Sequence, residues 1–225
     1  MKISIVIPTY ECYGKGWLYL NELLNSIYKQ DFKDFEVIVS DQSSDDSIRN
    51  LVHFYKDMMP IRLLDSRSIK RSISCNVNNA IMHAEGKYIK PMFMDDFFCK
   101  DNALSVINDN LDNSDSAWCA HSVLHCVSIN FLDGPLTPSY NHKIHLGANS
   151  MSGPSVITFK EKVYFDENLT LLMDCEFYKR MFITRGHPLI IKDVLSCNRH
   201  HNHQAQLEFS HLHKQEVAYV KGLYG

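Results

Sequence analysis

The sequence predicts an α/β fold, in which a mixed but mainly parallel sheet is flanked by helices. Short apolar, β-branched runs alternate with segments of helical periodicity, and this alternation repeats three times in the first hundred residues. Polar clusters follow three of these runs. Because right-handed crossovers bring the carboxyl ends of parallel strands to one edge, where ligands bind in open α/β sheets, we expect a site there.

The first elements follow from short stretches of sequence. The run 2–8 is apolar and ends at Pro8, which predicts a buried strand. Apolar residues then recur at helical spacing over 17–29. A second apolar run, 35–41, predicts the next strand, and the polar stretch "SSDDS" supplies capping residues for a helix around 48–55.

The third and fourth strands enclose another helix. The run 61–65 predicts a strand, and an apolar helical face follows it, with Gly86 as the stop signal. The run 87–94 predicts the fourth strand, although Pro91 cannot donate a ladder hydrogen bond and disfavours a central position.

The second half is less regular, but it contains no internal repeat and no low-complexity linker. We therefore expect one domain over 1–225, with a nucleotide-binding half at 1–100 and an acceptor-binding half at 101–225. The elements predicted in this half are a helix at 101–111, a strand at 117–129, a loop at 133–153, a strand at 154–160, a helix at 171–183, a strand at 188–195 and a polar, histidine-rich stretch at 196–206.

Composition excludes several classes of protein. The apolar content of 45% and charged content of 22% are those of an ordinary globular protein, and a net charge of −3 disfavours general nucleic-acid binding. The 7 cysteines form no CxxC pair, which suits a reducing compartment. No run is long enough for a membrane span or a secretory signal. We therefore expect a soluble, cytoplasmic protein of unspecified oligomeric state.

Three groups of residues could carry chemistry. Asp95 and Asp96 either form a solvated turn or hold a divalent cation with the help of phosphate oxygens. Asp174 either complements the dipole of a helix or acts as a general base. The histidine-rich run that follows Arg199 either is solvated or binds metal.

The order of the motifs resembles the inverting family-two glycosyltransferases of GT-A fold, including bacterial and phage-encoded members. The similarity begins with "ISIVIPTYE", "FEVIVSDQSSDDS" and "RSISCNVNNAIMHAEGKYI", which runs into "MFMDDFF". It continues with "SGPSVITFK", "LMDCEFYKR" and "RHHNHQ". The resemblance covers the chain from residue 3 to about 206, and it implies a single Rossmann-like GT-A domain.

The resemblance also implies a set of site residues. Asp174 would be the catalytic base. Asp95 and Asp96 would hold Mn²⁺ or Mg²⁺ and the donor ribose, with His201 as a further metal ligand, and Gln204 would close the last motif. The residues expected to bind the nucleotide-sugar donor are Pro8, Thr9, Tyr10, Glu11, Asp41, Arg71, Met94, Asp95 and Arg199.

Two positions depart from the family pattern. Phe93 stands where the acidic motif usually has a further acid, which leaves open whether Asp95 or Asp96 is the principal metal ligand. Met173 replaces the glutamate that usually precedes the catalytic aspartate.

The expected reaction is therefore transfer of a sugar, with inversion, from a nucleotide-diphosphate donor to a hydroxyl group. UDP is the default nucleotide on resemblance alone. The acceptor would be a surface or lipid-linked glycan or, if the gene is viral, a modified DNA base. Alternatives are a sugar nucleotidyltransferase, a non-catalytic nucleotide- or carbohydrate-binding module and, least favoured, a metal-dependent hydrolase that uses the "HNH" at 201–203.

Overall fold

The computed structural model describes residues 1–127, 130–131 and 134–225. Its strands are β1 (Ile3–Thr9), β2 (Phe35–Asp41), β3 (Ile61–Asp65), β4 (Tyr88–Pro91), β5 (Phe97–Phe98), β6 (Trp118–Val127), β7 (Asn130–Phe131), β8 (Ile157–Phe159) and β9 (Leu189–Arg199). Its α-helices are α1 (Gly16–Tyr28), α2 (Ser47–Tyr55), α3 (Ile73–Met82), α4 (Ala103–Asp112), α5 (Met173–Arg185), α6 (Ala205–Glu208) and α7 (His213–Tyr224).

One continuous sheet runs through both halves of the chain, in the order β3-β2-β1-β4-β8-β6-β9-β5, with β7 paired to β6. The strands β3, β2, β1 and β4 are mutually parallel, as are β6 and β9. The short strand β8 joins these two blocks through antiparallel pairings with β4 and β6. This confirms the predicted α/β class and its mainly parallel sheet.

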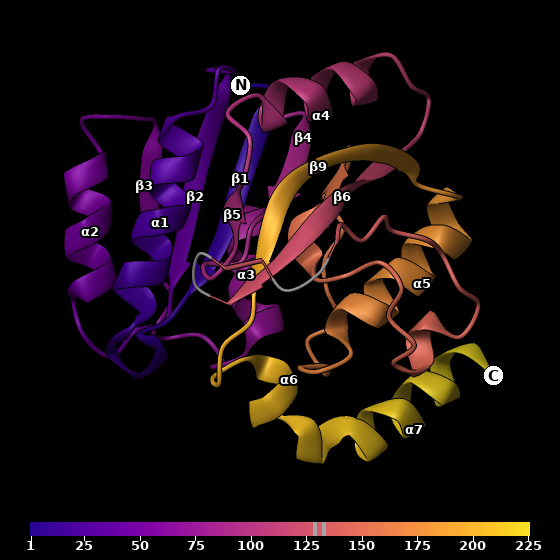
Figure 1. Cartoon of the computed structure of the whole chain (residues 1–225). Coiled ribbons are helices and arrows are strands. Elements are labelled where there is room, and N and C mark those ends of the chain that lie inside the picture. The colour runs from indigo at the N-terminus through magenta and orange to yellow at the C-terminus, as the bar shows by residue number, and fades with distance from the viewer. Residues whose placement is uncertain (128–129, 132–133) are drawn as a thin grey trace.

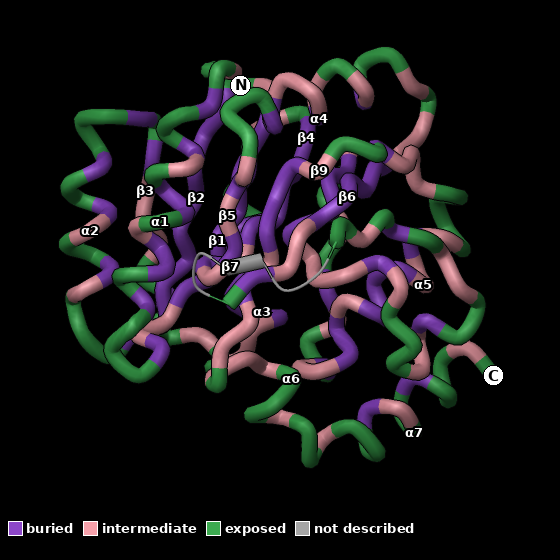
Figure 2. Tube along the Cα trace, in the orientation of Figure 1, coloured by how far each residue is buried: buried purple, intermediate pink, exposed green. Residues whose placement is uncertain are grey.

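Helices cover both faces of the sheet (Figure 1). On β1, Ile3, Ile5 and Ile7 face a core made with α1, α2 and α4. Val6 points to the opposite face, where the core includes α3, α5 and α7. This alternation follows from the two-residue period of a strand, and it buries the middle of the sheet between two helical layers (Figure 2).

Most predicted elements of the first half are present within a few residues of their expected bounds. The fourth strand ends at Pro91 instead of continuing to 94, although Met92 still donates to the carbonyl oxygen of Val6 over 3.0 Å. In the second half, the strand expected at 154–160 begins as a 3-10 turn, Pro154–Val156, and only Ile157–Phe159 pair as β8. The expected strand end at 128–129 and the start of the loop at 133 lie outside the described residues.

The prediction of a polar stretch over 196–206 is wrong for its first four residues. β9 continues to Arg199, because Ser196 and Cys197 pair with β5 on one side and β6 on the other. The sequence reading relied on the polarity of "SCNR" and did not detect the two flanking strands. The helices α6 and α7, which cross the lower edge of the molecule in Figure 1, also went unpredicted. Within the described ranges, none of the helices is long and apolar enough to cross a membrane.

Candidate active site

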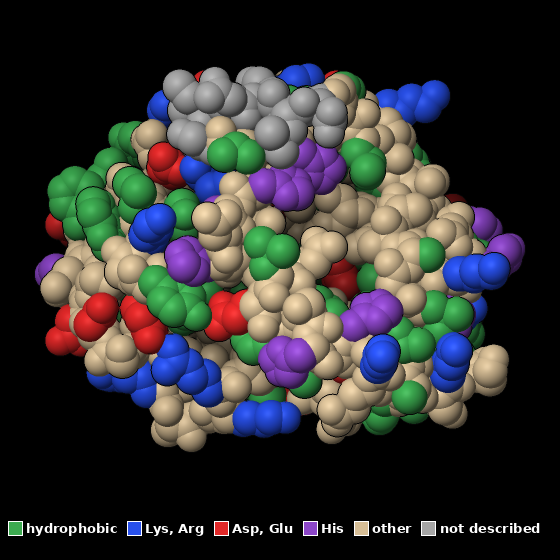
Figure 3. Space-filling model, turned by 60° about the horizontal axis from the view of Figure 1, so that its bottom comes forward, with side chains coloured by type: hydrophobic (Ala, Val, Ile, Leu, Met, Phe, Trp, Pro, Cys, Tyr) green, Lys and Arg blue, Asp and Glu red, His purple; other side chains and the backbone are tan. Residues whose placement is uncertain are grey.

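Two adjoining cavities lie at the edge where β1, β2 and β4 end. The first has a volume of about 370 Å³ and lies between the exit of β1, the start of α3 and the C-terminal segment after β9. The second, of about 350 Å³, lies between the acidic pair, the start of α5 and the same C-terminal segment. Asp95 lines both. The corresponding face is hollowed, with acidic side chains inside the hollow and histidines around it (Figure 3).

The structure brings nearly all the predicted site residues to these two cavities. Those that line the first are Pro8, Thr9, Tyr10, Glu11, Arg71, Met94, Asp95 and His201. Those that line the second are Asp95, Asp96, Asp174 and Arg199. Asp41 lines neither: its Oδ1 accepts hydrogen bonds from the Thr9 hydroxyl and from the amide and hydroxyl of Ser43. In this position Asp41 shapes the turn after β2, and its donor-binding role stays a prediction.

The wall of the first cavity is held by side-chain bonds that link separate loops. The Arg71 guanidinium donates to Oε1 of Glu11 over 2.8 Å, which ties the loop after β1 to the start of α3. The amide of Asn76, on α3, donates to the carbonyl oxygen of Thr9 over 3.0 Å. These contacts fix the exit of β1, so the cavity is largely formed without a ligand.

Asp95 contacts the imidazole of His201 at the wall of the first cavity. Nε2 of His201 lies 3.0 Å from Oδ2 of Asp95, and Nδ1 of the same ring accepts the amide proton of His203 over 3.2 Å. With Nδ1 accepting, the neutral ring carries its proton on Nε2 and donates it to Asp95. His201 also stacks on Tyr19 of α1, with ring centroids 5.0 Å apart, so its orientation is fixed from two sides.

Asp96 occupies a different environment from its neighbour. Its Oδ1 accepts the Arg199 amide over 3.1 Å, and the side chain is buried. Burial and the adjacent Asp95 raise the pKa of Asp96 well above its ordinary value, although hydrogen bonds from Ser155 and the Arg199 amide oppose this. The fully buried Lys90 holds the segment that carries Ser155, because its ammonium group donates to the carbonyl oxygens of Ser155 and Ile157.

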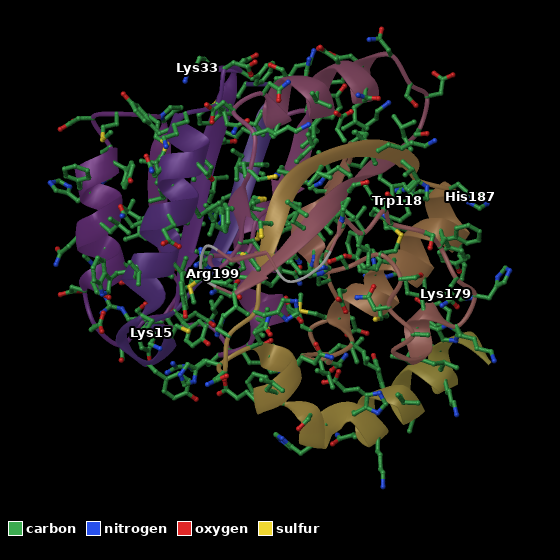
Figure 4. All side chains as sticks on the ribbon, in the orientation of Figure 1. Lys15, Lys33, Trp118, Lys179, His187 and Arg199 are labelled. Carbon is green, nitrogen blue, oxygen red and sulfur yellow. The ribbon has the colours of Figure 1, made fainter. Side chains whose placement is uncertain are left out.

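Arg199 is fixed at the end of β9 (Figure 4). Its Nε donates to the carbonyl oxygen of Asp95 over 2.9 Å, and its Nη2 forms an ion pair with Glu22 of α1. The guanidinium also lies 5.2 Å from the ring centroids of both Tyr19 and Phe97. Arg199 therefore holds the backbone of the acidic pair. It also lines the second cavity, and its predicted role in binding the donor stays a prediction.

Asp174 lies in the first turn of α5 and faces the second cavity. The side-chain amide of Asn149 donates to its Oδ2 over 2.8 Å, and the Cys175 amide donates to its Oδ1 over 2.7 Å. Burial nevertheless raises the pKa of Asp174 to about 6, because the hydrogen bonds only partly offset the loss of solvation. A carboxylate with this pKa accepts protons well near neutral pH.

Sequence reasoning missed several residues that shape the site. Tyr19 and Glu22 project from α1, where their spacing indicated only an amphipathic helix. Asn149 lies in a loop with no regular pattern, and its contact with Asp174 spans 25 positions. Tyr13 stacks on His203 at a centroid distance of 4.4 Å and closes one side of the first cavity. No local sequence pattern predicts such contacts, because the two partners lie far apart in the sequence and only the fold brings them together.

The fold and this edge of the sheet define the class: the chain has the GT-A architecture of nucleotide-sugar transferases. Its coordinates superpose on Staphylococcus aureus TarS, residues 1–349, in complex with UDP, with a TM-score of 0.72 at 20% identity, over 98% of this chain and 65% of that one. A Pyrobaculum calidifontis mannosyltransferase in complex with GDP-Man and Mn²⁺ gives a TM-score of 0.64 at 16% identity, over 88% of this chain and 56% of that one. The profile of Glycosyl transferase family 2 matches residues 4–181, and the chain belongs to that family.

Curated relatives agree with this assignment. The chain is 31% identical, over 127 residues, to a Campylobacter jejuni GalNAc(5)-diNAcBac-PP-undecaprenol beta-1,3-glucosyltransferase, a match that covers 56% of this chain and 38% of that protein. It is 32% identical over 103 residues to the S. aureus poly(ribitol-phosphate) beta-N-acetylglucosaminyltransferase TarS, covering 45% and 17%. A Rickettsia prowazekii glycosyltransferase is 26% identical, with 98% of this chain and 75% of that protein covered. The matches to the first two relatives thus span less than half the length of each relative.

Proposed function

We propose that the protein transfers a sugar, with inversion, from a nucleoside-diphosphate donor to an acceptor hydroxyl. The observation that carries this proposal is the arrangement of the two cavities around Asp95. Most of the residues expected to bind the nucleotide line one cavity, Asp174 lines the other, and the acidic pair lies where the two cavities adjoin. A donor that spans the acidic pair would present its anomeric carbon to the cavity that holds the base.

The chemistry of the reaction then follows from the residues present. The acceptor oxygen attacks the anomeric carbon from the side opposite the diphosphate, and the bond between that carbon and the diphosphate oxygen breaks. Asp174 takes the proton of the acceptor hydroxyl, and the nucleoside diphosphate leaves with the bonding electrons. Asn149 and the Cys175 amide hold the Asp174 carboxylate in place for this transfer.

The donor set at the acidic pair fits a divalent cation. Octahedral ligands about 2.1 Å from a Mg²⁺-sized ion lie about 3.0 Å apart at adjacent positions, and Nε2 of His201 and Oδ2 of Asp95 are separated by 3.0 Å. To ligate the ion, Nε2 would have to lose the proton that it donates to Asp95 in this hydrogen bond. Within the described part of the chain, no group of three or more metal-ligating side chains is assembled. The ion would therefore also need diphosphate oxygens, as is usual for Mg²⁺ in nucleotide sites. Bound there, Mn²⁺ or Mg²⁺ would supply positive charge to the leaving group.

UDP is the proposed nucleotide, and a sugar hydroxyl of a glycan or lipid-linked glycan is the proposed acceptor. The support comes from relatives: TarS has been solved with UDP and with UDP-GlcNAc, and the C. jejuni relative is named for a lipid-linked acceptor. Neither name refers to DNA, so a nucleobase acceptor is not proposed. Arg71 is the only Lys or Arg among the described residues that line the first cavity, which suits a diphosphate better than the triphosphate of a nucleotidyltransferase.

Thermal unfolding in the presence of UDP, GDP, CDP and dTDP, each with and without Mn²⁺, tests the donor site. We expect the largest rise in Tm with UDP and Mn²⁺, and we expect UDP release from a UDP-sugar to require Asp174. The Asp174→Asn variant should keep the Tm shift but lose turnover. Turnover that persists in this variant would contradict the assignment of the base, and the absence of a shift with every nucleotide would contradict the donor site.

A further inference from the structure

The C-terminal helix α7 reaches the segment that leads into Asp174 through one buried carboxylate. Oε1 of Glu216 accepts the amide of Thr170 over 2.9 Å, and Oε2 accepts the amides of Leu171 and Leu172 over 3.0 and 2.8 Å. These three amides are consecutive, and α5 begins directly after them with Met173. Glu216 thus binds the backbone two to four residues before Asp174.

The same segment is held from its other side by α3. The Ser74 hydroxyl donates to the carbonyl oxygen of Leu169, and the Asn78 side-chain amide donates to the carbonyl oxygen of Phe165. The contacts are complementary, because α3 supplies donors to carbonyl groups and α7 supplies an acceptor to amides. The backbone before α5 is therefore fixed between two helices that lie far apart in the sequence.

The choice of residue at position 216 is not explained by helix docking alone. Glu216 and Val220 are the buried residues of α7, and burial of a carboxylate carries a desolvation cost that an apolar side chain would avoid. A carboxylate is needed only if several donors must be satisfied at once. The helix also begins at the site itself, because His213, its first residue, lines the second cavity together with Asp174.

We propose that Glu216 is a positioning residue for the proposed base: by binding the amides of 170–172, it holds the start of α5 so that Asp174 faces the second cavity. This inference rests on the proposed function for its catalytic consequence. The structural part of the inference does not depend on the substrate: one side chain of α7 holds the segment before Asp174 in place.

The decisive variant is Glu216→Gln. Glutamine has nearly the same size, but its single carbonyl oxygen serves at most two of the three amides, and its NH₂ group then faces an N–H donor. A role in packing alone predicts that Gln is tolerated. Tyr224→Phe is the matched control, because it removes a 2.6 Å hydrogen bond from the same helix to Glu176 without touching 170–172.

We expect Glu216→Gln to lower kcat for UDP release from UDP-glucose or UDP-N-acetylglucosamine by roughly 10- to 100-fold, with the KM for donor little changed. The Tyr224→Phe variant should lower Tm but keep kcat within about twofold of the wild type. Glu216→Gln activity within that same range, or an equal loss of kcat in both variants, would overturn the proposal.

Hydrogen exchange separates failure of this inference from failure of the proposed function. Glu216→Gln should speed amide exchange at residues 170–172 and lower the pKa of Asp174 toward its ordinary value, whereas Tyr224→Phe, whose hydroxyl contacts Glu176 outside that window, should leave both unchanged. If the wild type turns over no UDP-sugar, the proposed function fails, and these two measurements still decide the role of Glu216. Unchanged exchange and an unchanged Asp174 pKa in the Gln variant would refute it.

Discussion

Nε2 of His201 and Oδ2 of Asp95 lie 3.0 Å apart, although 106 positions separate the two residues in the sequence. The contact joins the loop after β4 to the segment after β9, and both residues line the first cavity. It brings a histidine of the C-terminal segment into contact with the acidic motif, and the proposed metal role of both residues can be tested by removing either one.

Removal of either partner should abolish the metal-dependent part of nucleotide binding. We expect Asp95→Asn and His201→Ala to eliminate the additional Tm rise that Mn²⁺ gives in the presence of UDP, because each removes one of two adjacent ligands. The rise caused by UDP alone should remain. His211→Ala, which removes an exposed histidine from the same segment, is the control and should behave as the wild type. A full metal effect in Asp95→Asn would contradict the site.

Activity should rise with pH through the pKa of Asp174. Burial raises this pKa to about 6, and the base must be ionised to accept the acceptor proton. Below pH 6 the carboxylic acid predominates, so kcat should fall about tenfold per pH unit on the acidic side. Initial rates between pH 4.5 and 8.5 at saturating donor provide the measurement. A flat profile over this range would show that Asp174 does not limit the rate.

The raised pKa also predicts that Asp174 lowers the stability of the fold. In the unfolded chain an aspartate titrates near 3.9, so above pH 6 the folded state carries a partly buried charge that the unfolded state solvates better. The Asp174→Asn variant should therefore have an equal or higher Tm at pH 8, and its advantage should shrink as pH falls through 6. Thermal melts at pH 8 and pH 5 test this. A Tm that is lower than wild type at pH 8 would contradict it.

Arg199→Lys should destabilise the fold, although the variant retains the positive charge. Lysine cannot donate to the Asp95 carbonyl and to Glu22 at the same time with the geometry of a guanidinium, and it loses the planar contact with Tyr19 and Phe97. We expect a loss of about 1–3 kcal/mol in the free energy of unfolding. Denaturant melts provide the measurement, with Lys192→Arg, an exposed position on the same strand, as control. A melt that matches the wild type would show that these contacts are not stabilising.

Arg71→Ala should weaken donor binding without changing the chemical step. Arg71 lines the first cavity beside Glu11, whereas Asp174 lines only the second, so we expect Arg71 to bind the nucleotide equally in the ground and transition states. We expect the KM for the nucleotide sugar to rise by roughly tenfold, with kcat nearly unchanged. A fall in kcat at constant KM would place Arg71 in the chemical step instead.

The α/β class, most strands and the family were predictable because each rests on local periodicity or on motif order. The end of β9 could not be predicted. Ser196 and Cys197 are small or polar residues in the sequence, and they are buried only because β5 and β6 flank them. Asp95, Asp96 and Asp174 were identified from position within motifs. Asn149, which contacts Asp174, and Glu216, which holds the backbone before it, were not identified, because nothing near them in the sequence indicates contacts so far along the chain.

The pairing of β5 with β9 also bears on how the protein reaches its native state. Phe97 and Phe98 pair with Cys197 and Ser196, and Arg199 holds the Asp95 carbonyl, so residues made late in translation complete the surroundings of the acidic pair. Ribosomes extend a chain by about 5–20 residues per second. Strands β1 to β4 can therefore assemble on a nascent chain that still lacks its ligand site. The lining of the two cavities is complete only when residues 198–213 have been synthesised and docked, so we expect nucleotide binding at the proposed donor site to appear late in folding.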